Sequence, residues 1–154
     1  MSKKILDIGC GRNKYPNSIG IDINPKFNPD IILDINYDKL PFKDNSIDKV
    51  VCIQSIEHFG NPLHIFKEVY RVLKKGGIFH IETINVAVWW IRLLFFIDWN
   101  KGWRHKIGTD RTPHLIHWTP DTLSMWFELN NFKKIKKKKA NHFFHYKIII
   151  EGIK

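Results

Sequence analysis

The stretch Ile5-Leu6-Asp7-Ile8-Gly9-Cys10-Gly11 joins a short apolar run directly to a turn that contains two glycines. A short apolar run bounded by glycine is typical of a buried β-strand that ends in a tight turn. Because glycine lacks a β-carbon, the backbone of such a turn can approach a ligand closely and adopt positive φ angles. The stretch therefore predicts a first strand over residues 4–8, followed by a turn suited to holding a ligand.

Four further apolar runs predict strands, over residues 18–22, 30–34, 47–53 and 78–83. These runs are nearly continuous in apolar residues, as expected for parallel strands that are buried on both faces. Residues 132–139 and 143–153 are expected to form a final antiparallel pair.

Two helices are marked between these strands. Apolar residues at helical spacing follow Pro62, and Gly76-Gly77 is expected to end this helix after Lys74 and Lys75. Thr119 is expected to cap a second helix that begins at Pro120. Strands alternating with helices predict an α/β fold, with an open twisted sheet of about seven mostly parallel strands. We expect an antiparallel strand at its C-terminal end and helices on both faces.

The bulk composition fits one globular domain of 154 residues, with 44% hydrophobic and 26% charged residues. The net charge of +10 indicates either a solvated basic surface or a nucleic-acid or anionic-membrane partner, and the first reading is favoured. Two cysteines do not make a disulfide scaffold. With no signal-peptide layout and no apolar run long enough to span a bilayer, the cytoplasm is the expected location.

Two carboxylates lie at predicted strand ends: Asp22 closes the second strand and Asp34 the third. Ligands of open α/β sheets bind beyond the carboxyl ends of the strands. There, a carboxylate can accept hydrogen bonds from both hydroxyls of a ribose, and another can accept from the amino group of adenine. A glycine turn followed by two such acids predicts a nucleoside pocket.

With these features in this order, the chain resembles the class I S-adenosylmethionine-dependent methyltransferases. The resemblance is closest to the methyltransferase type 11-like subgroup that includes quinone and sterol methyltransferases. It covers residues 4–84 well and the rest more loosely. The matching stretches are Leu6-Asp7-Ile8-Gly9-Cys10-Gly11, Gly20-Ile21-Asp22, Leu40-Pro41-Phe42-Lys43-Asp44-Asn45-Ser46-Ile47-Asp48, Ile56-Glu57-His58 and Arg71-Val72-Leu73-Lys74-Lys75-Gly76-Gly77. The resemblance implies an enzyme of Rossmann-like fold with S-adenosylmethionine as its cofactor.

The resemblance also implies which residues hold the cofactor. The glycine turn would lie against its methionine and ribose portion, Asp22 would hold the ribose, and Asp34 with the Ile35 backbone would bind the adenine. The full set implied is Asp7, Gly9, Cys10, Gly11, Asp22, Ile23, Asp34, Ile35 and Gln54. One departure is that the family pattern places a full helix after the glycine turn, whereas residues 12–21 leave room for a loop or a single turn. We therefore expect a shortened first helix and a more open pocket.

His58 is the candidate catalytic residue, because it follows the fourth strand at the rim where the cofactor would lie. It could accept a proton from the methyl acceptor, but a packing or capping role is the alternative reading. His114 and His117 have no convincing cysteine or carboxylate partner in sequence, so no metal site is expected.

The substrate determinants are expected in an insertion over residues 85–131, between a cofactor-binding half at residues 1–84 and a strand pair at residues 132–154. The candidate acceptor-binding residues are Tyr15, Trp89, Arg111, His114 and His117. The apolar run at residues 86–97 could form a lid or a peripheral membrane contact, and a buried helix or an oligomer contact is the other reading. The sequence does not predict an oligomeric state.

The expected function is methyl transfer to a small-molecule, lipid-like or saccharide acceptor. A nucleic-acid methyltransferase is the first alternative, supported by the net charge. Against it, residues 54–58 lack the Asn/Asp-Pro-Pro-aromatic motif of many base-amino methyltransferases, and neither cysteine is placed to attack a pyrimidine. The second alternative is a cofactor-binding or partner-binding module without catalysis.

Overall fold

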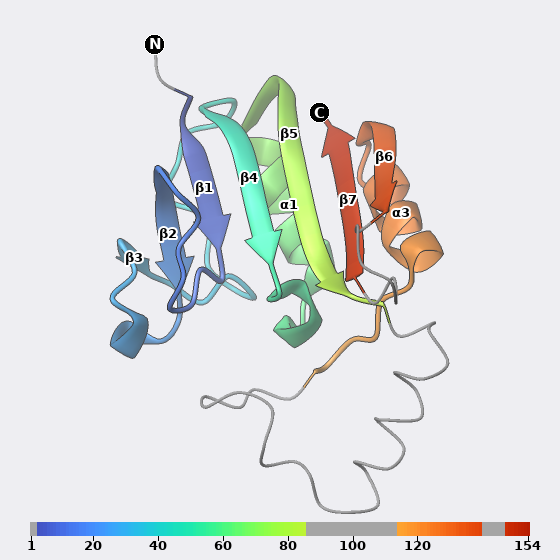
Figure 1. Ribbon diagram of the computed structural model, residues 1–154. Coiled ribbons are helices and arrows are strands. Elements are labelled where there is room, and N and C mark those ends of the chain that lie inside the picture. Colours follow the sequence, from blue (N-terminus) through green and yellow to red (C-terminus); the bar gives the residue numbers. More distant parts are fainter. Residues whose placement is uncertain (1–2, 86–113, 140–146) are drawn as a thin grey trace, which may run out of the picture.

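The structure is a computed structural model that describes residues 3–85, 114–139 and 147–154. These residues form one seven-stranded sheet in the order β3-β2-β1-β4-β5-β7-β6 (Figure 1). Its strands are β1 (Ile5–Ile8), β2 (Ser18–Asp22), β3 (Ile31–Ile32), β4 (Ile47–Ile53), β5 (Leu73–Ile84), β6 (Lys133–Lys139) and β7 (Lys147–Ile153). Strands β1 to β5 pair in parallel, whereas β7 runs antiparallel to both β5 and β6. The predicted Rossmann-like sheet is therefore confirmed.

Two α-helices pack against this sheet, α1 (Pro62–Val72) and α3 (Pro120–Leu129). Phe66 of α1 and Phe127 of α3 both contact Phe79 of β5, each with ring centroids 5.3 Å apart. Both helices thus cover the same face of the sheet, and Figure 1 shows α1 behind β4 and β5. Helices were predicted on both faces, but in the described ranges the opposite face carries no α-helix. Residues 9–17 join β1 to β2 through turns alone, as the short connection predicted.

The boundary between α1 and β5 differs from the prediction. The helix ends at Val72 instead of running to Gly76-Gly77, and β5 begins at the next residue. Leu73 is fully buried and pairs with Ile47, while Lys74 forms an ion pair with Asp48 at 2.7 Å. Burial of Leu73 in the sheet therefore outweighs continuation of the helix. The third strand is also shorter than predicted, since only Ile31 and Ile32 pair with β2.

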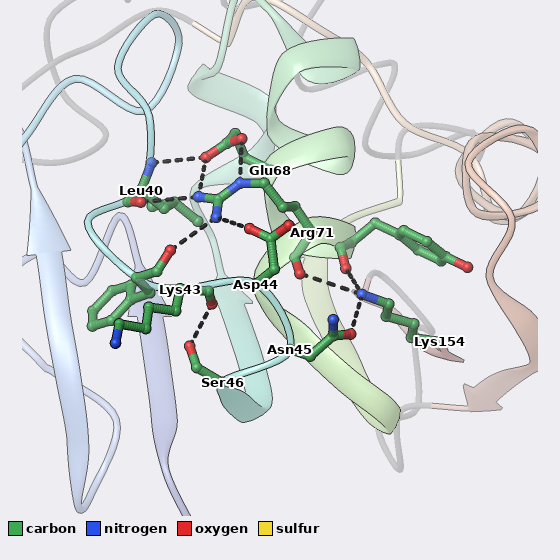
Figure 2. Close-up of polar contacts among 10 residues, drawn as sticks. Leu40, Lys43, Asp44, Asn45, Ser46, Glu68, Arg71 and Lys154 are labelled. Carbon is green, nitrogen blue, oxygen red and sulfur yellow. Dashed lines mark hydrogen bonds and ion pairs between the residues drawn. The ribbon is translucent and has the colours of Figure 1, made fainter.

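Arg71 ties α1 to the loop that precedes β4, as Figure 2 shows. Its guanidinium donates to both carboxylate oxygens of Glu68 at 2.8 Å and to Asp44 Oδ1 at 2.7 Å. It also donates to the carbonyl oxygens of Leu40 and Phe42, at 3.0 and 2.8 Å. Two of the stretches that carry the family resemblance meet here, Leu40 to Asp48 and Arg71 to Gly77. We call this set of hydrogen bonds around Arg71 the clamp, and it lies away from the carboxyl ends of the strands.

The face of the sheet away from α1 and α3 carries a line of polar contacts. Lys138 of β6 pairs with Glu151 of β7 at 2.8 Å, and Glu151 contacts His80 of β5 at 2.9 Å. His80 also contacts Glu82 at 3.2 Å. One face of the sheet is therefore apolar and covered by helices, and the other joins three strands through polar side chains. Among the described residues, no helix has the length and apolar character needed to cross a membrane.

Candidate functional site

A cavity of about 270 Å³ lies beyond the carboxyl ends of β1, β2 and β4. These strand ends lie at the lower edge of the sheet in Figure 1. This volume is close to the lower end of the range for small-molecule sites. The residues that line it are Gly9, Ile21, Asp22, Ile23, Asn24, Phe27, Leu33, Asp34, Ile35, Asn36, Ser55, His58 and Phe59. The cavity therefore has apolar walls with two carboxylates and an imidazole among them.

Asp22 connects the glycine turn to the next loop. Its Oδ2 accepts a hydrogen bond from the Gly11 amide and its Oδ1 accepts one from the Asn24 amide, both at 2.9 Å. The amides of Gly9 and Cys10 donate to the carbonyl oxygen of Ile21, at 2.8 and 3.0 Å. The turn and the end of β2 are thus fixed to each other before any ligand is present.

Asp34 lies in the turn after β3, with one carboxylate oxygen committed to a neighbour. Its Oδ1 accepts from both the backbone amide and the side-chain amide of Asn36, at 3.0 and 2.9 Å. Asn36 in turn accepts from the Gly60 amide at 2.9 Å, which links this loop to the segment after β4. The two acids of the cavity wall are therefore held by separate sets of hydrogen bonds.

Asp7, Cys10, Gly11 and Gln54 lie outside the cavity lining, although the resemblance placed them near the cofactor. Asp7 is buried, and this burial raises the pKa of its carboxyl group, while a 2.8 Å hydrogen bond from the Tyr15 amide opposes the shift. Gln54 follows β4 directly and has a left-handed backbone, with φ of 51°. Its Nε2 atom is buried and has no hydrogen-bond partner in the part of the chain that the structure describes. Strained backbone combined with an unsatisfied amide is more frequent at ligand sites than elsewhere.

His58 lines the cavity and lies in the short 3₁₀ helix η2 (Ile56–His58) that follows β4. The ring of His114 lies against it, with centroids 4.8 Å apart and planes inclined by 67°. Burial, together with the neighbouring His58 and His117, lowers the pKa of His114 to about 4. His114 is therefore a neutral imidazole at neutral pH, able to offer a lone pair.

Of the remaining acceptor-binding candidates, Tyr15 and His117 belong to the described residues, and neither lines the cavity. Tyr15 lies over the sheet, where its hydroxyl accepts a hydrogen bond from Lys49 at 3.3 Å. His117 is exposed on the segment that leads to α3. Trp89, Arg111 and the apolar run at residues 86–97 lie outside the described residues.

Sequence reasoning missed part of the cavity wall. The missed residues are Ile21, Asn24, Phe27, Leu33, Asn36, Ser55 and Phe59. Asn24 and Asn36 each follow a strand-end acid by two residues, the spacing at which an aspartate accepts from a backbone amide. That repeated spacing could have identified both. Phe27 and Phe59 carry no comparable signal, because only the folded loops turn them toward the cavity.

Comparison with known proteins supplies the family. Residues 6–81, about half of the chain, match the model of a methyltransferase domain family. Cycloartenol-C-24-methyltransferase 1 of Oryza sativa subsp. japonica is 30% identical over 101 residues, which cover 51% of this chain and 29% of that protein. The chain thus spans less than a third of the length of this curated relative.

Solved structures extend the comparison to the whole fold. A SAM-dependent methyltransferase from Archaeoglobus fulgidus superposes with a TM-score of 0.76 at 19% identity, covering 99% of this chain and 86% of the other. A SAM-dependent methyltransferase from Thermotoga maritima gives a TM-score of 0.74 at 16% identity, with coverage of 100% and 83%. With the glycine turn and both strand-end acids at the carboxyl edge of such a sheet, the chain belongs to the class I methyltransferases, the family that uses S-adenosylmethionine.

Proposed function

We propose that this chain transfers the methyl group of S-adenosylmethionine to a small-molecule, lipid-like or saccharide acceptor. The observation that carries the proposal is the cavity itself, where the turn at Gly9, Asp22 and Asp34 converge beyond the strand ends. When bound, S-adenosylmethionine supplies a methyl group already activated by its positively charged sulfur. What the chain must add is a place for the cofactor, a place for the acceptor, and their alignment.

The hydrogen-bonding capacity of the two acids fits a nucleoside. A carboxylate has about four acceptor positions, and the recorded bonds to Asp22 use one on each oxygen. One position on each oxygen therefore remains for the ribose hydroxyls. Both recorded bonds to Asp34 fall on Oδ1, which leaves Oδ2 for an amino group such as that of adenine. Apolar walls at Ile23 and Ile35 suit the flat face of the base.

Gln54 suits the methionyl end of the cofactor. Its buried Nε2 at the end of β4 is a donor without a hydrogen-bond partner among the described residues, and a carboxylate of the ligand would satisfy it. Asp7, beneath the glycine turn, would orient that turn through its bond to the Tyr15 amide. Cys10 and Gly11 would contribute backbone instead of side chains.

In this proposal, most of the rate acceleration comes from the alignment of the bound cofactor with the methyl acceptor. Holding two reactants in the productive geometry lowers a barrier by up to about 7–11 kcal/mol. His58 is an imidazole on the cavity wall, and it is placed to accept a proton if the acceptor must lose one during attack. The acceptor would enter past His58, on the side where His114 and His117 lie.

A lipid-like acceptor is supported by the names of relatives, two of which are a cycloartenol-C-24-methyltransferase and a malonyl-[acyl-carrier protein] O-methyltransferase. Each matches only part of its own length in this chain, 29% and 38%. They therefore support a class of acceptor, not a particular compound.

The test is calorimetric titration of the full chain with S-adenosylmethionine and S-adenosylhomocysteine, comparing native protein with Asp22→Ala. We expect saturable binding that the substitution weakens at least tenfold, about 1.4 kcal/mol, because the ribose hydroxyls lose their acceptor.

Asp30→Ala is the matched control. Asp30 also accepts a hydrogen bond from a backbone amide, that of Gly20 at 2.6 Å, but it lies outside the cavity lining. Its removal should leave cofactor affinity within about twofold. If the folded native chain binds neither ligand at millimolar concentration, the proposed function fails for this chain on its own.

A further inference from the structure

Three side chains with metal-ligating atoms meet beside the cavity: Glu57, His58 and His114. One ligand atom from each lies within 4.8 Å of the other two. Glu57 and His58 are neighbours in η2, whereas His114 comes from the segment that leads to α3. The fold thus brings the imidazole of His114 to a carboxylate and an imidazole that lie far from it in sequence.

Backbone hydrogen bonds hold the two segments together. The amides of Leu115 and Ile116 both donate to the carbonyl oxygen of Glu57, at 2.7 and 3.2 Å. These bonds fix the residues that follow His114 to the 3₁₀ turn that carries the other two side chains. The three groups are therefore placed by main-chain contacts and not by chance proximity of long side chains.

The carboxylate of Glu57 is also oriented. Its side chain is almost fully buried, at 3% exposure, and Oε2 accepts a hydrogen bond from Thr83 Oγ1 at 2.8 Å. Thr83 itself is fully buried in β5. In metal sites, ligating carboxylates are held in this way by a second hydrogen-bonding partner. A buried carboxylate needs hydrogen bonds or a cation to compensate for its burial, and a metal ion beside it would supply positive charge.

We propose that Glu57, His58 and His114 bind a divalent transition-metal ion of the zinc type. Two imidazoles and one carboxylate are a ligand set that zinc uses with a fourth position left open. Zinc bonds of about 2.0–2.2 Å put tetrahedral ligand atoms about 3.4 Å apart, so the widest separation here closes by roughly 1.4 Å on binding. Because His58 also lines the cavity, the open position adjoins the space assigned to the acceptor.

Ion binding goes beyond the proposed function and does not require it. An ion would take the lone pair of His58, so that residue could no longer accept a proton from the acceptor. In exchange, the ion would polarise an acceptor oxygen at its open position. This use of the ion rests on the proposed function, whereas the existence of the site does not.

The experiment is titration of the EDTA-treated full chain with zinc by calorimetry, and with cobalt by visible absorption as a spectroscopic probe. We expect one equivalent of zinc to bind, and cobalt to give the intense absorption of a low-coordinate nitrogen and oxygen site. His58→Ala and His114→Ala should each weaken zinc at least tenfold. Magnesium, which prefers six oxygen ligands, should bind at least 100-fold more weakly than zinc.

His64→Ala is the matched control, since His64 is a part-exposed histidine on α1 that contacts the carbonyl oxygen of Asp38. It should leave zinc binding within twofold. The proposal is overturned if the native chain takes up no stoichiometric zinc, if His114→Ala binds zinc as tightly as native protein, or if His64→Ala loses as much. The same samples are also titrated with S-adenosylhomocysteine, which separates the two proposals. A chain that binds zinc but not S-adenosylhomocysteine would count against the methyltransferase function and not against the metal site.

Discussion

Gly9 and Gly11 differ in their surroundings, although both have positive φ angles, 67° and 52°. A β-carbon added to Gly9 would lie 2.6 Å from Cβ of Ser55, whereas one added to Gly11 would have no neighbour within 4 Å. Ser55 cannot move away easily, because its hydroxyl donates to backbone carbonyl oxygens at the ends of β1 and β4. A substitution at Gly11 therefore tests backbone strain alone, whereas a substitution at Gly9 tests strain and close packing together.

We expect Gly11→Ala to cost about 1 kcal/mol of stability, the strain of a left-handed alanine. Gly9→Ala should cost roughly 3 kcal/mol, since the overpacking is added to the strain. Urea denaturation of the two variants beside native protein measures both values. Equal losses would mean that the turn relaxes away from Ser55.

The two cysteines are both shielded. Burial raises the pKa of Cys10 to about 11, with the negative charges of Asp7 and Asp22 adding to the shift, and burial also raises the pKa of the fully buried Cys52. Below those values the unreactive thiol predominates. Neither residue is therefore suited to nucleophilic catalysis at neutral pH.

Alkylation followed by mass spectrometry checks this. At pH 8, Cys10 should react roughly 100-fold more slowly than an unshielded thiol, with a rate that keeps rising toward pH 10. Cys52 should react only after unfolding in urea. A rate at Cys10 that levels off near pH 9 would contradict the expected pKa.

Arg71 acts at the level of elements, because it joins α1 to the loop before β4. Lysine cannot reproduce a planar group that donates to Glu68, Asp44 and two carbonyl oxygens at once. We expect Arg71→Lys to cost roughly 2 kcal/mol. Arg71→Ala should cost about 3 kcal/mol, because the largely buried Glu68 loses its charged partner and keeps only the hydrogen bond from the Leu40 amide.

Urea denaturation again measures the loss, with Lys67→Ala as control, since Lys67 is exposed on the same helix and its removal should cost less than about 0.5 kcal/mol. If Arg71→Lys is as stable as native protein, the clamp is not what holds the loop.

The elements that the sequence predicted well are those whose signal is local. Thr119 caps α3 and Pro120 begins it, as expected, and Thr122 completes the capping box. The end of α1 was predicted wrongly, because the pairing of Leu73 with Ile47 is a contact between distant residues that no local pattern contains.

The same limit applies to the prediction of the candidate site. Asp22 and Asp34 are recognisable at strand ends, but the approach of His114 to His58 depends on backbone bonds to Glu57. The expected absence of a metal there stays a prediction, although the carboxylate that His114 lacks in the nearby sequence comes from another part of the chain.

At the scale of the molecule, charge is unevenly placed. The net charge is +10, and the edge strand β6 carries consecutive lysines. Two of them already have acidic partners, Lys137 with Asp121 at 2.7 Å and Lys138 with Glu151 at 2.8 Å. An edge strand rich in lysine resists pairing with other chains, which accounts for the pattern without a nucleic-acid partner.

We therefore expect RNA binding to be weak, indifferent to sequence and steeply dependent on salt. Affinity for a single strand falls with a logarithmic slope of about −0.7 for each phosphate neutralised. Fluorescence anisotropy with two unrelated RNA sequences, at low and at physiological salt, measures this slope. Tight binding at physiological salt with a preference for one sequence would instead favour a nucleic-acid acceptor.

The junction of α1 and β5 has a consequence for how the chain can change in length. Ile47 pairs with Leu73, but Lys49 pairs with Ile78, so residues 74–77 bulge out opposite Asp48 alone. A residue inserted in this bulge would enlarge an exposed irregularity and leave both flanking pairs in register. The same insertion made further along β5, between Phe79 and His80, would turn every following side chain of the strand to the other face. Thr83 would then leave Glu57, and the carboxylate of Glu82 would take its place beside that of Glu57. Homologues of this chain should accordingly vary in length at the bulge and keep a fixed count from Ile78 to Thr83.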